Sequence, residues 1–239
     1  RTENSTVYSE VPGLYEKVPE IMSSCSFVSS GRYKSLFDDI TKATSGNNTA
    51  DVATMGVSEN FFEMFTFPLS QGEPADVLKT KNSVVISENL ANTLFPDGDA
   101  LGKEINIYEK NPLKEFAPEV SDLNMNLTVT GIFKPFGRTV FIEPDMIIRF
   151  DLVKELEYAM YMGSMQIGEY SFVRLAKGAD SEKIISGLNA GLTKVARRYS
   201  RKDFKMTVEL TPFDEIKKQN PIEYGHAFKN IRQGKLYNI

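Results

Sequence analysis

Hydrophobic positions follow two different periods along the chain. Alternation of apolar and polar residues, or a short apolar run, predicts strands, and these fall at 26–33, 51–57, 84–86, 104–108, 127–133, 146–148, 170–176 and 204–210. Apolar residues three or four positions apart predict amphipathic helices, which fall at 13–23, 88–95, 151–162, 181–198 and 213–218. The clearest helical stripe consists of Ile184, Ile185, Leu188, Leu192 and Val195.

Several polar residues and one proline predict where these elements begin. Ser58, Ser87 and the Asp180–Ser181 pair suit helix N-caps, because their side-chain oxygens can accept a hydrogen bond from a backbone N–H of the first turn. Pro212 suits the first turn of a helix. Residues 45–49 have the composition of a loop.

The order of these elements predicts the fold class. Strand–helix–strand units occur near both chain ends, and the middle of the chain is rich in strands. This order predicts an α+β fold in which one subdomain is inserted into another. Residues 109–124 do not fit a regular element, and a loop of that length within a compact domain is often functional.

The composition excludes several classes of protein. The 239 residues, 26.9 kDa in mass and 41% hydrophobic, suffice for a real core. A single Cys excludes a disulfide framework and a multi-cysteine metal site, and a single His argues against a histidine metal centre. With 28 Lys and Arg against 32 Asp and Glu, the net charge of −4 argues against a nucleic-acid binder.

No apolar run approaches the roughly 20 residues that cross a bilayer. The chain starts at Arg1 without an apolar signal segment. We therefore expect a domain cut from a longer protein.

No catalytic constellation is visible in the sequence. His226 lies in a polar segment and is interpreted as a surface residue, and Cys25, which has no second thiol, is interpreted as a small, partly buried residue. A basic group over 197–205 is explained by the favourable interaction of cations with a helix C-terminus, although contact with phosphate or anionic lipid is an alternative. The phenylalanines over 61–67 suit either a ligand pocket or a subdomain core, and the core interpretation is favoured.

Five sequence blocks, in order, resemble a known family. They are GVSENFFEMF at 56–65, PLSQGE at 68–73, SVVISENLANTLF at 83–95, LGKEI at 101–105 and LTVTGIF at 127–133. This order resembles the MacB-type periplasmic core domain of ABC-transporter permeases, in the FtsX-like permease superfamily. The family-motif residues, to which the resemblance assigns structural roles, are Phe61, Phe62, Gly72, Ala91, Phe95, Gly102 and Gly131.

The resemblance implies a porter-like subdomain built from both chain ends and an inserted, strand-rich, sabre-like subdomain. The corresponding boundaries are 1–57 and 151–239 for the porter-like part, and 58–150 for the sabre-like part. The segment 109–124 fits no part of the family pattern.

The resemblance also implies a function. It indicates a non-catalytic domain without cofactor or metal, on the periplasmic side of the bacterial inner membrane, that transmits ATP-driven conformational change to a substrate or partner. The implied partners are the rest of the permease, its cytoplasmic ATPase, a second copy in a homodimer, and a periplasmic adaptor or exported substrate, but no nucleic acid.

Two other classes remain open at this level. The first is an extracellular ligand-binding sensor domain of a membrane receptor, and the second is a soluble enzyme, which the missing constellation disfavours. Within the permease hypothesis, we expect partner contact at Pro112, Leu113 and Phe116, which are apolar residues in a long charged segment. The alternative is that these three residues fold back onto the core of the inserted subdomain.

Overall fold

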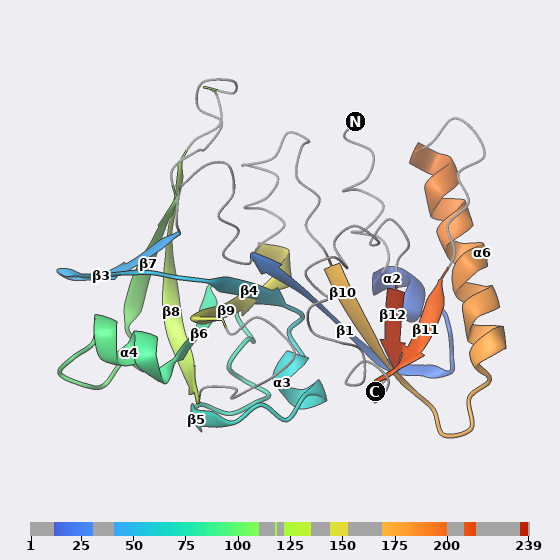
Figure 1. Cartoon of the computed structure of the whole chain (residues 1–239), viewed down its shortest axis with the longest axis horizontal. Helices are drawn as coiled ribbons and strands as arrows, with labels where there is room; N and C mark the ends of the chain where they lie inside the picture. The colour runs from blue at the N-terminus through green and yellow to red at the C-terminus, as the bar shows by residue number, and fades with distance from the viewer. Residues whose placement is uncertain are drawn as a thin grey trace. The chain divides into compact units, whose positions relative to one another are not determined.

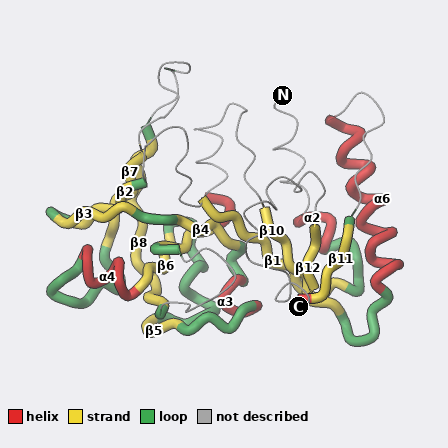
Figure 2. Tube along the Cα trace, in the orientation of Figure 1, coloured by secondary structure: helices red, strands yellow, loops and turns green. Residues whose placement is uncertain are grey.

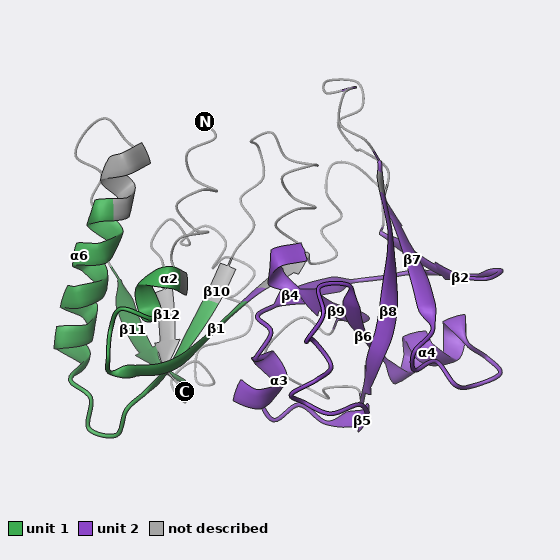
Figure 3. Cartoon of the chain, turned by 180° about the vertical axis from the view of Figure 1, so that it is seen from behind, with its two compact units in different colours: residues 1–26, 168–239 green, residues 27–167 purple. Residues whose placement is uncertain are grey.

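The computed structural model describes residues 12–30, 41–109, 118, 122–134, 144–152, 169–199, 208–213 and 235–238. Figures 1 and 2 show a mixture of strands and a few helices. The chain forms two compact units (Figure 3), and only the second consists of one continuous segment. Unit 1 comprises residues 1–26 and 168–239, and unit 2 comprises residues 27–167. The predicted α+β class is confirmed.

Unit 2 is built on a mixed sheet. Its strands are β2 (Lys42–Ser45), β3 (Asn48–Asp51), β4 (Thr54–Val57), β5 (Leu69–Gln71), β6 (Ser83–Ser87), β7 (Glu104–Glu109), β8 (Leu123–Phe133) and β9 (Met146–Arg149), together with the last residues of β1 (Ile21–Ser30). The strand order is β1-β4-β9-β6-β8-β7-β2-β3, and β5 pairs with β8. The β4–β9 and β6–β8 pairs are parallel.

The core of unit 2 follows from this order. Strand β6 lies between β8 and β9, and all five of its residues are buried, as expected for an uninterrupted apolar strand. Helix α4 (Glu88–Leu94) packs Leu90 and Leu94 into the same core cluster as Ile105 and Val129. The cluster takes its residues from within 43–152.

Unit 1 packs two helices on a smaller group of strands. Strand β12 (Lys235–Asn238) lies between β10 (Glu169–Leu175) and β11 (Glu209–Pro212), parallel to both. Helix α6 (Ser181–Tyr199) buries three members of its predicted stripe, Ile184, Leu188 and Leu192. These contact Leu14 and Tyr15 of the short helix α2 (Pro12–Tyr15).

Three local predictions are wrong. The predicted helix over 13–23 ends at Tyr15, and Ile21 already begins β1, because Pro19 lacks the N–H that a continuing helix needs. The predicted loop over 45–49 is the hairpin of β2 and β3, turning at residues 46–47. Pro212 is the last residue of strand β11, and Phe213 directly after it is helical, in agreement with the helix predicted to open there; 214–218 lie outside the described residues.

The third concerns Ser58. Helix α3 (Phe61–Met64) has Asn60 at its N-cap position, and no side chain caps it. Ser58 contributes its backbone carbonyl, which accepts from the N–H of Phe61 at 3.0 Å. Backbone turn geometry, and not a side-chain cap, therefore starts this helix.

The division into compact units falls at other positions than the boundaries expected from the sequence. Strand β1 begins in unit 1 and continues into unit 2, with the division after Ser26. Strands β2 and β4 belong to unit 2 because they pair with β7 and β9, and β3 belongs to it because it pairs with β2. The predicted boundaries at 57 and 150 cannot reflect these pairings, which join residues far apart in the sequence.

Candidate functional site

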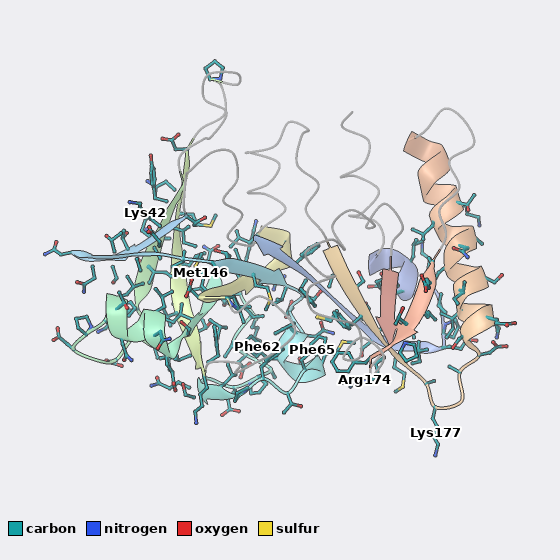
Figure 4. The ribbon with its side chains drawn as sticks, in the orientation of Figure 1. Lys42, Phe62, Phe65, Met146, Arg174 and Lys177 are labelled. Atoms are coloured by element: carbon teal, nitrogen blue, oxygen red, sulfur yellow. The ribbon has the colours of Figure 1, made fainter. Side chains whose placement is uncertain are left out.

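The family-motif residues, all within unit 2, form the first candidate site. Phe61 is buried at the centre of a group of rings. It stacks on Phe67 with a centroid distance of 5.0 Å and meets Phe62 edge-on at 5.3 Å. Phe27 of β1 approaches the same ring at 6.4 Å. Figure 4 shows Phe62 and Phe65 at α3. Side chains, rather than a ligand, therefore surround Phe61.

Gly72 and Gly131 form a contact that leaves no space for a side chain. A Cβ on Gly131 would lie 2.7 Å from Val77 Cγ1 and 3.1 Å from Val85 Cγ1. A Cβ on Gly72 would lie 2.6 Å from the same Val77 atom and 2.8 Å from the carbonyl oxygen of Thr130, and its φ is +96°. Both glycines therefore let the 69–77 segment approach β8 closely.

Helix α4 and its following turn hold the remaining motif residues. The Ser87 hydroxyl accepts from the Leu90 N–H at 3.1 Å, so the predicted cap is confirmed. Ala91 is buried in the core, and Lys103 Nζ lies 5.5 Å from the centroid of the Phe95 ring. Gly102 has φ +80° and open space around it, so its backbone angle, rather than packing, favours glycine there.

A second cluster surrounds Arg149 at the end of β9, and the sequence gave no indication of it. We call Arg149, Glu59 and Asp151 the Arg149 cluster. Arg149 donates to both carboxylate oxygens of Asp151, at 3.0 and 2.9 Å, and to Glu59 Oε2 at 2.8 Å. It also donates to the carbonyls of Leu78 and Lys79, each at 3.3 Å.

The position of Arg149 explains why this cluster joins several segments of the chain. Val57 of β4 is its register partner, so the residues that follow β4, including Glu59, pass close by. The guanidinium thus joins four segments: the end of β9, the approach to α3, the turn before β6, and the residues after β9. Its side chain is only 19% exposed, so solvent competes weakly for these bonds.

The electrostatics of the cluster keep it charged. The hydrogen bond to Asp151 raises the pKa of Arg149, despite the opposing effect of burial. Burial pushes the pKa of Asp151 upward, but the hydrogen bonds and charge of Arg149 outweigh it, so the pKa of Asp151 is lowered. No proton donor or acceptor poised near neutral pH results.

Unit 1 contains an ion pair of its own. Lys183 of α6 donates to Glu20 Oε1 at 2.7 Å, and this hydrogen bond lowers the pKa of Glu20 and raises the pKa of Lys183. The Glu20 carbonyl also accepts from the Ala176 N–H at 2.8 Å. Glu20 therefore links the start of β1 to α6 and to the end of β10.

The expected partner-contact residues Pro112, Leu113 and Phe116 lie outside the described residues, as does His226. The strands that flank this segment, β7 and β8, form a long antiparallel pair. Their outer face is polar: Asn106 donates to Asn124 Oδ1 and Asn126 Oδ1 at 2.6 and 2.8 Å, and Tyr108 donates to Asp122 at 2.9 Å.

Within the described ranges, no group of three or more His, Cys, Asp or Glu side chains is placed to hold a metal ion. Within the same ranges, no helix combines the length and the apolar character needed to span a membrane.

Comparison with known proteins defines the class. The model of the MacB-like periplasmic core domain family matches residues 3–190, so this chain belongs to that family. No curated protein matches the chain.

Two solved structures share its fold. A domain assigned to a permease protein from Porphyromonas gingivalis has a TM-score of 0.53 and 21% identity, over 80% of this chain and 76% of that chain. The periplasmic region of MacB from Actinobacillus actinomycetemcomitans has a TM-score of 0.52 and 17% identity, over 88% of this chain and 80% of that chain. At these identities, the likeness concerns the fold alone.

Proposed function

We propose that this chain is the extracytoplasmic domain of an ABC-type permease, and that it transmits ATP-driven conformational change to a periplasmic substrate or partner without catalysing a reaction. The observation that carries the proposal is the family match over residues 3–190. It favours a permease over the ligand-binding sensor considered from the sequence.

The organisation of the chain suits this role. Unit 1 takes its residues from both chain ends, and unit 2 is inserted between them. The chain enters unit 2 within β1, a regular strand. A force applied at the chain ends is therefore transmitted to unit 2 through β1, the strand by which the chain enters that unit. Transmission needs closely packed elements that move as units, and the Gly72–Gly131 contact and the Arg149 cluster supply close packing within unit 2.

Within this proposal, unit 1 is the porter-like subdomain and unit 2 the sabre-like subdomain. The domain lies on the periplasmic side of the bacterial inner membrane, in a homodimeric permease with a cytoplasmic ATPase. The partner is a periplasmic adaptor or an exported substrate, and no cofactor takes part.

Hydrogen exchange in the assembled transporter tests the proposal. The full permease and its ATPase, reconstituted in lipid nanodiscs, are compared with and without a non-hydrolysable ATP analogue. We expect exchange rates to change at amides of 21–30 and 144–152, where the chain enters unit 2 and where the Arg149 cluster lies. If the nucleotide-saturated ATPase leaves every amide of 12–238 unchanged, the proposal is wrong.

The partner-contact residues are tested separately. Deletion of 110–120, which removes Pro112, Leu113 and Phe116, should abolish export while leaving the amount of permease in the membrane unchanged. A deletion variant that exports normally would exclude this segment from partner contact. Triple replacement of the three residues by Ser is the matched variant that preserves chain length.

A further inference from the structure

Strand β4 lies between the strand by which the chain enters unit 2 and the last described strand of that unit. β1 pairs antiparallel with one edge of β4 through residues 27–30, the first residues of unit 2. β9 pairs parallel with the other edge, and the next described strand, β10, already belongs to unit 1. The three strands are neighbours in the sheet (Figure 1). The entry strand and the last strand of unit 2 therefore border the same strand.

One row of residues runs across these three strands. Val57, the last residue of β4, is the register partner of Phe27 on one side and of Arg149 on the other. Arg149 is likewise the last residue of β9. Val57 and Phe27 are buried. The row thus marks the point at which β4 and β9 both end beside β1.

The residues that follow β4 contact both of its neighbours through their side chains. The Phe61 ring of α3 meets the Phe27 ring edge-on, with the centroids 6.4 Å apart. Two positions earlier, the Glu59 carboxylate accepts a hydrogen bond from Arg149 at 2.8 Å. The segment 57–61 therefore binds β1 through a ring contact and β9 through an ion pair.

Backbone hydrogen bonds give this segment a fixed shape. The Ser58 carbonyl accepts from the Phe61 N–H at 3.0 Å, and the Asn60 carbonyl accepts from the Met64 N–H at 2.9 Å. The Phe61 ring is buried, and the guanidinium that binds Glu59 is only 19% exposed. Because Glu59 and Phe61 lie two positions apart in one turn, neither contact can be displaced far while the other stays in place.

We propose that the 57–61 segment couples β1 to β9, so that residues 27–30 and 149–152 open as one cooperative unit. Proteins open locally in contiguous units of this kind. Without the segment, the two stretches would open separately, because β4 lies between them. Arg149 is the positioning residue, since it binds the segment and also holds Asp151 beyond the end of β9. The inference goes beyond the proposed function, because it concerns the folded chain without an ATPase.

Hydrogen exchange of the full 239-residue chain under native conditions tests the coupling. Arg149→Ala should speed local exchange at 57–61 and, two strands away, at 27–30 by the same factor. We expect about a tenfold change or more, because hydrogen bonds to a charged group are lost. Phe27→Leu, which removes the ring contact, should in turn speed exchange at 149–152. An Arg149→Ala variant in which 27–30 exchange at the unmodified rate would overturn the proposal.

The two substitutions combined test whether Arg149 transmits the effect. In the Arg149→Ala background the connection to β9 is broken, so adding Phe27→Leu should no longer change exchange at 149–152. An undiminished effect there would show that backbone pairing with β4 couples the strands, and it would contradict the role of the 57–61 segment.

A milder variant keeps the test decisive if Arg149→Ala folds poorly. Arg149→Lys keeps the charge but lacks the forked donors that bond both carboxylates together. It should speed exchange at 27–30 and 149–152 together, by a smaller factor than Arg149→Ala. Acceleration at only one of the two stretches, or at neither, would contradict the proposal.

Leu127→Ala is the matched control for a general loss of stability. Leu127 of β8 is buried, and β6 and β9 separate β8 from β4 in the strand order. Its truncation should destabilise unit 2 without selective acceleration at 27–30 and 149–152. If Leu127→Ala accelerated these two stretches as selectively as Arg149→Ala does, general destabilisation would explain the result and the proposal would be wrong.

Discussion

The requirement for glycine at position 131 can be measured directly. Gly131→Ala would place a Cβ 2.7 Å from Val77 Cγ1, and such overpacking costs about 1–3 kcal/mol. We expect a loss of this size in the free energy of unfolding by urea. Gly102→Ala is the matched control, with open space around it; its positive φ costs about 1 kcal/mol. A loss at Gly131 no larger than that at Gly102 would show that Val77 moves aside for the added Cβ at little cost, since Gly131 has no positive φ.

The Arg149 cluster predicts a pH-dependent contribution to stability. The lowered pKa of Asp151 means that its pair with Arg149 stabilises the folded chain above the ordinary carboxyl pKa of 3.8, and that this stability is lost as the pH falls through the lower, folded value. Arg149→Ala should remove about 1.5–3 kcal/mol near neutral pH. It should also lose less further stability than the unmodified chain between about pH 5 and pH 2.

Urea unfolding near neutral pH and at the acid end of this range measures how much stability each variant loses. Glu59→Gln is the comparison variant, because Glu59 makes one contact with Arg149 while Asp151 makes two. A smaller loss is expected for Glu59→Gln than for Asp151→Asn. If Arg149→Ala kept the full acid dependence of the unmodified chain, other carboxylates would be responsible for it.

At the scale of elements, two glycines of α6 face different parts of the N-terminal segment, one facing α2 and the other facing the turn that follows it. A Cβ at Gly187 would have ordinary contact with Val18, at 3.9 Å, whereas one at Gly191 would lie 3.0 Å from Leu14 Cδ2. Alanine favours an internal helical position over glycine by about 1 kcal/mol. Gly187→Ala should therefore stabilise the chain by roughly 0.5–1 kcal/mol. Gly191→Ala should gain less, because Leu14 must move.

Thermal unfolding of the two variants, side by side, measures this difference. A Gly191→Ala variant as stable as Gly187→Ala would mean that Leu14 yields freely and that α2 is loosely packed. The stability changes of the two substitutions should add in the double variant only if α2 keeps its position.

Elements whose start depends on neighbouring residues were predictable from the sequence. Ser87 caps α4, and Asp180 Oδ1 accepts from the Glu182 N–H at 3.0 Å at the start of α6. Both bonds span only a few residues. The β2–β3 hairpin was missed because its strands, KATS and NTAD, lack strong hydrophobic alternation. Pairing of β2 with β7, which lies far along the chain, gives β2 a partner on its other side.

At the scale of the whole molecule, the two units predict different behaviour for two fragments. The core cluster of unit 2 draws only on residues within 27–167. We expect the isolated segment 27–167 to unfold cooperatively in urea. The segment 58–150, which follows the boundaries expected from the sequence, lacks β2, β3 and β4 and the core residues Ala43, Val52 and Leu152.

Circular dichroism and urea unfolding distinguish the two fragments. The shorter fragment should unfold at lower urea, or lack a cooperative transition, because burial of its core is incomplete. If both fragments were equally stable, the boundaries at 57 and 150 would describe the inserted subdomain better than the division of the structure does.

The sequence by itself determined the α+β class, the family resemblance, most strands, and the caps of α4 and α6, because these depend on periodicity and on bonds between near neighbours. Only the tertiary structure decided which segments the Arg149 cluster joins and that Gly72 and Gly131 lie in close contact. Glu59 and Arg149 are 90 positions apart, and Gly72 and Gly131 are 59 positions apart. Such contacts arise when sheet pairing brings remote segments together, and no local pattern encodes that pairing.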